Sequence, residues 1–195
     1  MRLLVATTNA NKIREIRALL DGAGVDLVTL EAWPRIPAPE ETGSTFDENA
    51  RQKALYYAAA TGELTVAEDS GLEIDALGGA PGVESARFGG AALPYADKFA
   101  LIYERLRAAG RVDSSARFVC ALALVRDGRV EFHTRGTVEG RIASAPSGTN
   151  GFGYDPIFLY PPYGCTLAQA TAEQKAAVSH RGQAFRELRS YLQKS

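Results

Sequence analysis

The first thirty residues place one amphipathic helix between two apolar segments, and this pattern constrains the fold more than any other feature of the sequence. Leu3 to Thr7 predicts a buried strand that ends at the polar run Thr8 to Lys12. The apolar side chains of residues 13–20 recur on one helical face, and Val25 to Leu30 predicts a second strand. Because a strand–helix–strand crossover normally makes a parallel pair, the chain is expected to open as an α/β protein.

The rest of the chain continues to alternate helical and strand patterns. Thr45 and Glu48 form a capping-box pattern, which predicts a helix running to about Ala60. Leu64 to Ala67 predicts a short strand that ends in an acidic turn at residues 68–71. The further predicted elements are a Gly- and Pro-rich loop over residues 78–94, a helix from Tyr95, a β-hairpin around Asp127-Gly128, a glycine-rich loop over residues 143–156, a short helix begun by the capping box at Thr171, and a last helix carrying Phe185, Leu188 and Leu192.

This order of elements predicts a mixed-sheet protein of the α/β or α+β class. Its 195 residues are 46% hydrophobic, enough to bury a core as one domain over residues 1–195. The sequence has no internal repeat, no low-complexity segment and no long linker. We therefore expect a single folded domain, with room for two lobes.

Charge and cysteine content exclude several classes of protein. With 22 basic and 23 acidic residues the net charge is −1, so no overall field attracts nucleic acid or an anionic membrane. The two cysteines, Cys120 and Cys165, match neither a zinc-binding nor a disulfide pattern. The sequence shows no signal peptide and no apolar stretch of membrane-spanning length. These features predict a soluble cytoplasmic protein.

The polar run Thr7 to Lys12 joins the first predicted strand to the first predicted helix. Backbone N–H groups at a helix N-terminus, small hydroxyls and a lysine suit a polyphosphate, although the Walker pattern is absent. Taken alone, the run is better explained as an ordinary helix start with an asparagine cap.

Acidic residues occur at two places where a metal site is conceivable. Glu40 and Glu41 precede a helix whose Asn49 and Lys53 share one face, although a solvated helix face explains that pair as well. Glu68 and Asp69 follow an apolar run, and Mg²⁺ prefers one or two such carboxylates together with substrate phosphates. An exposed acidic turn is the alternative interpretation.

The last third of the chain carries aromatic and basic residues that suit a nucleotide base. The segment Gly151 to Asp155 offers aromatic faces beside a carboxylate, or else a glycine-rich turn with core aromatics. Lys175, His180 and Arg181 lie around the start of the last predicted helix, where they would suit an anion or a carbonyl oxygen.

Each of these segments is a weak signal, but their order along the chain is specific. Over nearly its whole length the sequence resembles the inosine triphosphate pyrophosphatase family, the pyrophosphatases of non-canonical purine nucleoside triphosphates. The matching segments are 6–12, Glu40-Glu41-Thr42-Gly43, Glu48-Asn49-Ala50, Glu68-Asp69-Ser70-Gly71-Leu72, 77–83, 151–158 and Ser179-His180-Arg181-Gly182.

The resemblance implies a role for each matching residue. Asp69 is expected to be the proton acceptor in catalysis, and Mg²⁺ the cofactor. The expected metal ligands are Glu40, Glu41, Glu68 and Asp69. The expected substrate-binding residues are Thr7, Thr8, Asn9, Ala10, Asn11, Lys12 and Lys53 for the phosphates, Ser70 and Arg87 for the nucleotide, and Phe152, Gly153, Tyr154, Asp155, Lys175, His180 and Arg181 for the base.

The same resemblance implies an elongated mixed β-sheet flanked by helices, two lobes with a cleft between them, and a homodimer. The implied reaction hydrolyses ITP, dITP or XTP to the nucleoside monophosphate and pyrophosphate. Two alternatives stay open: a nucleotide-binding module without turnover, and a related pyrophosphatase acting on modified pyrimidine or canonical nucleotides.

Overall fold

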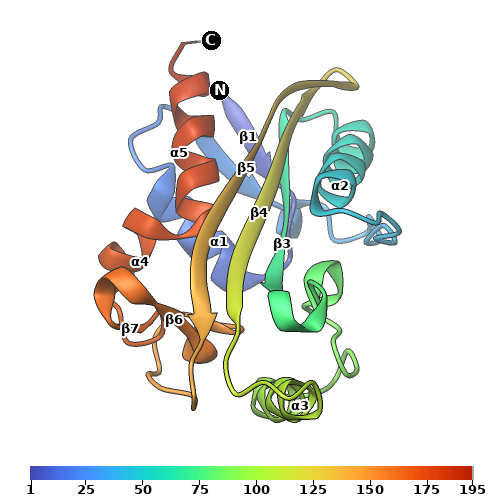
Figure 1. Cartoon of the computed structure of the whole chain (residues 1–195). Helices are drawn as coiled ribbons and strands as arrows, with labels where there is room; N and C mark the ends of the chain where they lie inside the picture. Colours follow the sequence, from blue (N-terminus) through green and yellow to red (C-terminus); the bar gives the residue numbers. More distant parts are fainter. Residues whose placement is uncertain (195) are drawn as a thin grey trace. The chain divides into compact units, whose positions relative to one another are not determined.

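The computed structural model describes residues 1–194, and within them it contains helices and strands in the alternating order that the sequence predicts (Figure 1). The strands are β1 (Arg2–Val5), β2 (Asp26–Thr29), β3 (Thr65–Ile74), β4 (Ser115–Arg126), β5 (Arg129–Ile142), β6 (Phe158–Tyr160) and β7 (Cys165–Thr166). The α-helices are α1 (Ala10–Leu19), α2 (Phe46–Thr61), α3 (Tyr95–Ala108), α4 (Ala172–Val178) and α5 (His180–Leu192).

The strands form one mixed sheet in the order β2-β1-β3-β4-β5-β6-β7. Strand β1 runs parallel to both of its neighbours, with Leu4 opposite Val28 of β2 and Thr65 of β3. The pairs β5–β6 and β6–β7 are antiparallel. The predicted parallel opening and the mixed α/β fold are therefore confirmed.

The chain divides into two compact units. Unit 1 comprises residues 1–69, 120–136 and 180–195, of which residue 195 lies outside the described part, and unit 2 comprises residues 70–119 and 137–179. The three long strands β3, β4 and β5 each contribute residues to both units. Each unit buries apolar side chains of its own.

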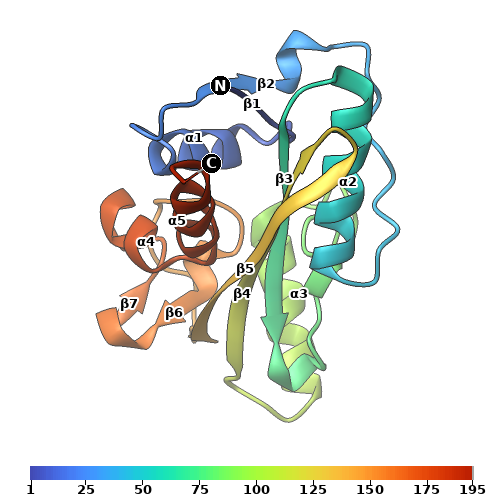
Figure 2. The same ribbon diagram turned by 90° about the horizontal axis from the view of Figure 1, so that it is seen from above.

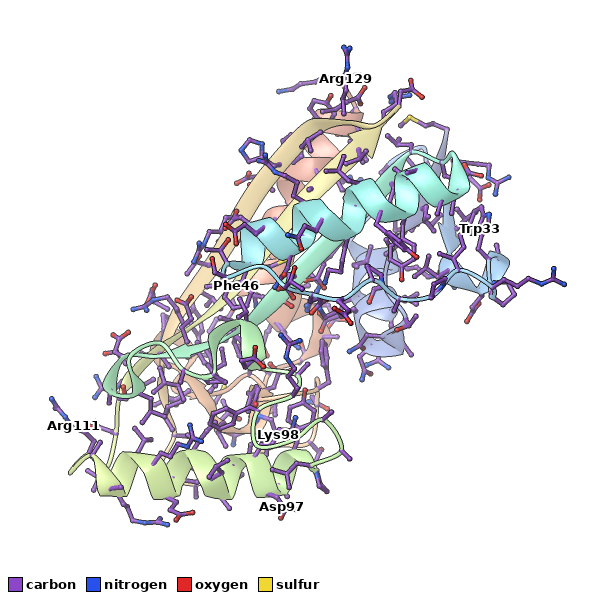
Figure 3. The ribbon with its side chains drawn as sticks, turned by 90° about the vertical axis from the view of Figure 1, so that its right-hand side faces the viewer. Trp33, Phe46, Asp97, Lys98, Arg111 and Arg129 are labelled. Atoms are coloured by element: carbon purple, nitrogen blue, oxygen red, sulfur yellow. The ribbon has the colours of Figure 1, made fainter. Side chains whose placement is uncertain are left out.

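Unit 1 is built around β1 and β3, which are covered by helices. Helices α1 and α5 pack against each other (Figure 2). Their apolar faces, including Ile16 and Phe185, form one core cluster with Leu3 and Val66 of the strands. A second cluster joins α2, through Ala54 and its neighbours, to the same strands. Trp33 packs on that second cluster (Figure 3).

Unit 2 has a core made by the far ends of the long strands, α3 and the loop after β5. Ile102 and Leu106 of α3 pack with Phe118 and Phe158, whose ring centroids lie 4.5 Å apart. On the same helix Asp97 faces outward while Lys98 is 1% exposed and donates a hydrogen bond to the carbonyl oxygen of Ala86 (Figure 3). The buried lysine thus ties α3 to the turn before Arg87.

The predicted hairpin is confirmed, and its turn has the geometry that its two residues favour. Asp127 and Gly128 both have positive φ, 49° and 74°, as a two-residue turn between twisted strands requires. Arg129 lies directly beyond this turn, at the end of the hairpin (Figure 3). Among residues 1–194, no helix is both long and apolar enough to cross a membrane.

The acidic turn predicted at residues 68–71 is wrong, because β3 continues through these residues to Ile74. Gly71 is needed for close contact rather than for a turn. A Cβ atom there would collide with the Ser85 side chain and the Gly82 carbonyl oxygen. Ser85 Oγ also accepts a hydrogen bond from the backbone N–H of Leu72 at 2.9 Å. The strand therefore passes against the 82–85 turn within unit 2.

Candidate active site

The loop between β1 and α1 is a well-formed helix start. Asn9 is the N-cap, and its Oδ1 accepts hydrogen bonds from the backbone N–H groups of Asn11 at 3.0 Å and Lys12 at 3.2 Å. Thr7 Oγ1 accepts from the N–H of Asn9 at 3.2 Å, while Thr8 and Ala10 are exposed. The cap therefore already uses two of the backbone N–H groups that were expected to face a phosphate. The positive charge of this loop comes from the Lys12 ammonium.

That ammonium points at Glu68, a carboxylate buried in β3. Lys12 Nζ lies 3.0 Å from Glu68 Oε1, and the same oxygen accepts hydrogen bonds from Arg181 Nε at 3.2 Å and Nη2 at 3.1 Å. The other oxygen, Oε2, accepts from the Cys120 thiol at 3.6 Å. Both Glu68 and Arg181 have less than 5% of their surface exposed. Glu68 is thus enclosed by donors from α1, β4 and α5.

A second carboxylate completes this buried network. Arg181 Nη1 donates to Glu15 Oε2 of α1 at 2.9 Å, so the guanidinium bridges two acids. Burial alone would raise the pKa of Glu68, but the positive charges of Arg181, Lys12 and Lys53 outweigh it and hold that pKa far below its ordinary value. The same pairing raises the pKa of Arg181 against the effect of its own burial. The pair therefore stays charged at neutral pH.

Asp69, the next residue along β3, contacts α2 directly and is linked through Lys53 to the acidic loop before that helix. Its Oδ2 accepts a hydrogen bond from Asn49 Nδ2 at 3.0 Å, and its Oδ1 lies 3.6 Å from Lys53 Nζ. Lys53 Nζ also donates to Glu41 Oε1 at 2.6 Å. One ammonium group therefore joins the carboxylates of Glu41 and Asp69.

The ionisation of this group of residues follows from burial and from the close opposite charges. Burial raises the pKa of Asp69 above its ordinary value, although Lys53 and Asn49 act in the opposite direction. Burial acts to lower the pKa of Lys53, but the charges of Asp69 and Glu41 outweigh it, so that pKa is raised. A carboxylate with a raised pKa is a better proton acceptor than an exposed aspartate.

The residues expected to contact the base lie mainly in unit 2. Lys175 Nζ lies 2.5 Å from Asp155 Oδ2, which also accepts from the backbone N–H of Phe152 at 2.8 Å. The same ammonium lies 4.7 Å from the centroid of the Phe152 ring. Gly151, whose φ is +71°, has no room for a Cβ atom beside Asp155. This segment is a compact loop held by a buried ion pair.

The two aromatic residues of this loop have different environments. Tyr154 belongs to the core of unit 2, where it is 3% exposed and its hydroxyl donates to the Ser85 carbonyl oxygen at 2.8 Å. Its ring packs edge-to-face on Tyr95, with centroids 5.2 Å apart. Phe152 is only half-buried. Of the two rings, that of Phe152 is therefore the less buried.

The remaining predicted residues are distributed over both units. Ser70 directly follows Asp69 and is half-buried at the start of unit 2. Arg87 lies in the turn after residues 82–84 and pairs with Glu84, with Nε 2.5 Å from Oε2. His180 is buried at the start of α5 in unit 1, next to Arg181. The predicted base set is therefore divided among a unit 2 loop, helix α4 and the first turn of α5.

Within unit 1, the structure brings together the cations and acids that the sequence identified as separate motifs: Lys12, Lys53, Glu41, Glu68, Asp69 and Arg181. It does not bring Glu40 into contact with them, because that side chain is exposed.

Two residues of this network, Glu15 and Cys120, were not predicted from the sequence. Glu15 follows Lys12 by three residues and so shares its helical face, a usable signal. Cys120 lies in an apolar run that gives no signal.

The acidic residues fit a small, hard cation that takes only a few of its ligands from the protein. Among residues 1–194 no group of three or more potential ligands from His, Cys, Asp and Glu converges. Glu41 and Asp69 nevertheless converge on one cation, the Lys53 ammonium. Mg²⁺ commonly takes only one or two carboxylates and completes its shell with water and phosphate oxygens. The two carboxylates and the oxygen-only donor set therefore fit Mg²⁺.

Known proteins resemble this chain in sequence and in fold. A model of the Ham1 family matches residues 3–191. A dITP/XTP pyrophosphatase of Exiguobacterium sibiricum is 47% identical over 192 residues, covering 98% of this chain and 97% of its own, and one from Thermus thermophilus is 46% identical, covering 96% and 90%. The structure of a HAM1 protein from Coxiella burnetii is 40% identical, covers both chains fully and has a TM-score of 0.92. The family resemblance inferred from the motifs is confirmed: this chain belongs to the Ham1 family.

Proposed function

We propose that this chain hydrolyses non-canonical purine nucleoside triphosphates (ITP, dITP and XTP) to the monophosphate and pyrophosphate, and thereby removes them from the nucleotide pool. Family membership supports this activity, as do relatives named dITP/XTP pyrophosphatase that align with nearly the whole chain. The single observation that carries the proposal is the position of Asp69. Asp69 is a buried carboxylate that contacts Asn49 and Lys53, and the Lys53 ammonium also binds Glu41.

We further propose that the enzyme depends on Mg²⁺, with Glu41 and Asp69 as its protein ligands. Glu68 was expected to share this role, but its oxygens already face Lys12, Arg181 and Cys120. Glu68 is better suited to orient Lys12. Of the adjacent acids Glu40 and Glu41, the half-buried Glu41 has the better position. When bound, the metal would supply charge stabilisation to phosphate oxygens.

The residues of unit 1 can then act on the triphosphate and on water. Lys12 and Lys53 each lie beside a carboxylate, so a triphosphate competes for ammonium groups that are already ordered. Asp69 accepts the proton of the attacking water, a role that its raised pKa favours. Arg181, fixed by Glu15 and Glu68, keeps the Glu68 carboxylate in place beneath Lys12.

Selectivity for 6-oxopurines is proposed to come from donors around the base. Hypoxanthine and xanthine carry an acceptor oxygen at position 6, where adenine carries an amino donor. Lys175, which is held by Asp155, and the backbone N–H groups of the Phe152 loop are donors that suit this oxygen, and an adenine amino group facing them would place donor against donor. Sites built on such hydrogen bonds reject the wrong analogue by roughly 10⁴ or more.

A panel of substrates tests the activity and separates the alternatives. Pyrophosphate release is measured with Mg²⁺ for ITP, XTP, GTP, ATP and dUTP, with and without EDTA, and with Asp69→Asn as the inactive control. We expect turnover of ITP and XTP that excess EDTA abolishes. Binding without turnover would support the non-catalytic nucleotide module, and preferred hydrolysis of dUTP or ATP would support a pyrophosphatase of different specificity.

We also propose an oligomeric state and a location. A homodimer follows from the family resemblance alone, and sedimentation equilibrium tests it directly. Location in the cytoplasm is supported by the nucleotide pool on which the enzyme would act and by the free thiols of Cys120 and Cys165. Fractionation of cells producing the tagged protein checks the location.

A further inference from the structure

Asn49 has a completely buried amide that is hydrogen-bonded at both ends. It lies in the first turn of α2, which begins at Phe46 (Figure 3), and none of its surface is exposed. Its Nδ2 donates to Asp69 Oδ2 at 3.0 Å, and its Oδ1 accepts from the backbone N–H of Gly43 at 2.8 Å. Such groups are rarely buried without a reason, because each unmade bond is costly.

The chemistry of the two partners fixes the orientation of this amide. The Gly43 N–H can only donate, so it must face the amide oxygen. The amide nitrogen then necessarily faces Asp69, whose ionised carboxylate can only accept. Asn49 is therefore a donor to Asp69, and its hydrogen bond favours the charged form of the acid.

The other end of the amide holds the loop that carries Glu41. Gly43 lies two residues after Glu41, and a Cβ atom on Gly43 would collide with the Asn49 amide oxygen and with Glu48 Cβ. Lys53, one helical turn beyond Asn49, contacts the Oε1 of Glu41 and the Oδ1 of Asp69. Asn49 thus occupies one oxygen of Asp69 and leaves the other facing Lys53.

We propose that Asn49 is a positioning residue for the reaction. Its amide fixes the rotamer of Asp69 and the place of the Glu41 loop, so that both carboxylates are presented to the same cation and to the attacking water. This inference rests on the proposed function, because it assigns a role within the same site. A purely structural link between α2 and the loop would affect stability alone.

Two substitutions separate the two ends of the amide. Asn49→Asp keeps the shape and the acceptor for Gly43, but replaces the donor that faces Asp69. Asn49→Ala removes both hydrogen bonds. We expect both variants to lose about 10-fold or more in kcat for ITP at saturating Mg²⁺, with KM within about 3-fold of the wild type.

Two measurements without nucleotide test the same arrangement. Exchange of the Gly43 amide hydrogen, followed by NMR, should remain slow in Asn49→Asp and become fast in Asn49→Ala. Binding of Mn²⁺, followed by electron paramagnetic resonance, should weaken by roughly 10–100-fold in Asn49→Ala. A structural role alone would change neither metal affinity nor the kcat of the folded fraction.

Ala58→Gly is the matched control. It weakens the same helix, because glycine is a poor helix former, at a buried position two turns beyond Asn49. We expect it to retain wild-type kcat and Mn²⁺ affinity. An equal loss of kcat in this control would overturn the inference, as would wild-type kcat in Asn49→Asp or wild-type Mn²⁺ affinity in Asn49→Ala.

Failure of this inference is distinguishable from failure of the proposed function. If the wild type releases pyrophosphate and the Asn49 variants do so equally well, only the role of Asn49 is refuted. If the wild type hydrolyses no nucleotide, the proposed function is refuted, while Mn²⁺ binding and Gly43 exchange still decide whether Asn49 organises the carboxylates.

Discussion

Adjacent acidic residues at the centre of this protein have opposite environments. Glu68 is surrounded by cations and its pKa is lowered, whereas burial dominates at Asp69 and raises its pKa. The difference arises because consecutive strand residues point to opposite faces of the sheet. One face meets Lys12 and Arg181, and the other meets Asn49 and Lys53. A single dipeptide thus supplies a carboxylate that stays charged at neutral pH and the carboxylate that we propose as the proton acceptor.

Asp69→Asn should lower kcat by roughly 10²–10⁴, because general-base catalysis contributes about that much. The change is isosteric, so the fold should persist, as circular dichroism can verify. Rates are compared at saturating Mg²⁺ to separate proton transfer from metal binding. A kcat near the wild-type value would move the base role to Glu41 or Glu68.

Lys175→Met should reduce kcat/KM for ITP more than for ATP, because it removes a donor near the half-buried Phe152 ring. The measurement is the ratio of kcat/KM for the two nucleotides. Lys98→Met is a suitable control, since Lys98 is also a buried lysine of unit 2 but donates to a backbone carbonyl. Equal ratios for wild type and Lys175→Met would refute the proposed base recognition.

The sequence predicted well those helices, strands and turns whose signals come from residues close together in the chain. The crossover from β1 through α1 to β2, the Asp127-Gly128 hairpin and the Thr171 capping box all follow from neighbouring residues, and all are confirmed. The continuation of β3 to Ile74 was missed, because Glu68-Asp69-Ser70-Gly71 has the composition of a turn. Its burial depends on tertiary partners that no local pattern encodes.

The same limit applies to the candidate site. Lys12, Asp69 and Lys175 were identified from motif order, but their partners were not. The contacts of Glu68 with Cys120 and of Arg181 with Glu15 join residues 52 and 166 positions apart. Such pairs become visible only when β3, β4 and α5 are assembled. The sequence therefore named the candidate residues, but it did not predict what each one contacts.

At the level of strand β3, Gly71→Ala should destabilise the protein by about 1–3 kcal/mol, because the added methyl meets the Gly82 carbonyl oxygen and the Ser85 side chain. Urea unfolding measures the loss. Ser85→Ala made alone, and combined with Gly71→Ala, shows how much of the collision is with that side chain. No loss in Gly71→Ala would mean that the strand and the turn are not in close contact.

Stability of the whole molecule should depend on pH through Glu68. Its pKa is lowered in the folded protein, so its stabilising contribution is complete above the unfolded value of about 4.3 and is lost as the pH falls below it. Glu68→Gln should cost roughly 3–5 kcal/mol at pH 7, because it leaves buried cations without this carboxylate. Free energies of unfolding are measured in EDTA from pH 7 to pH 2.

The difference in free energy of unfolding between the wild type and Glu68→Gln should become steadily smaller as the pH falls from about 5. Glu84→Gln serves as the control, because Glu84 also has a lowered pKa but lies exposed in unit 2, so its substitution should hardly change the curve. A gap that stays constant over the whole pH range would show that the Glu68 charge does not contribute to folding.

Unit 1 is made of three separate segments of the chain, and this has a consequence for when it can fold during synthesis. Lys12 and Glu68 are translated early, but Arg181 and the apolar face of α5 belong to the last segment of the same unit. On the ribosome, the first 69 residues therefore wait for nearly the entire polypeptide before their core can close. Premature termination upstream of α5 would release a chain that keeps Lys12 and Lys53 but whose Glu68 carboxylate lacks its arginine. A chain that stops before α5 thus lacks both the arginine that pairs with Glu68 and the apolar helix face that packs on β1 and β3 in the core of unit 1.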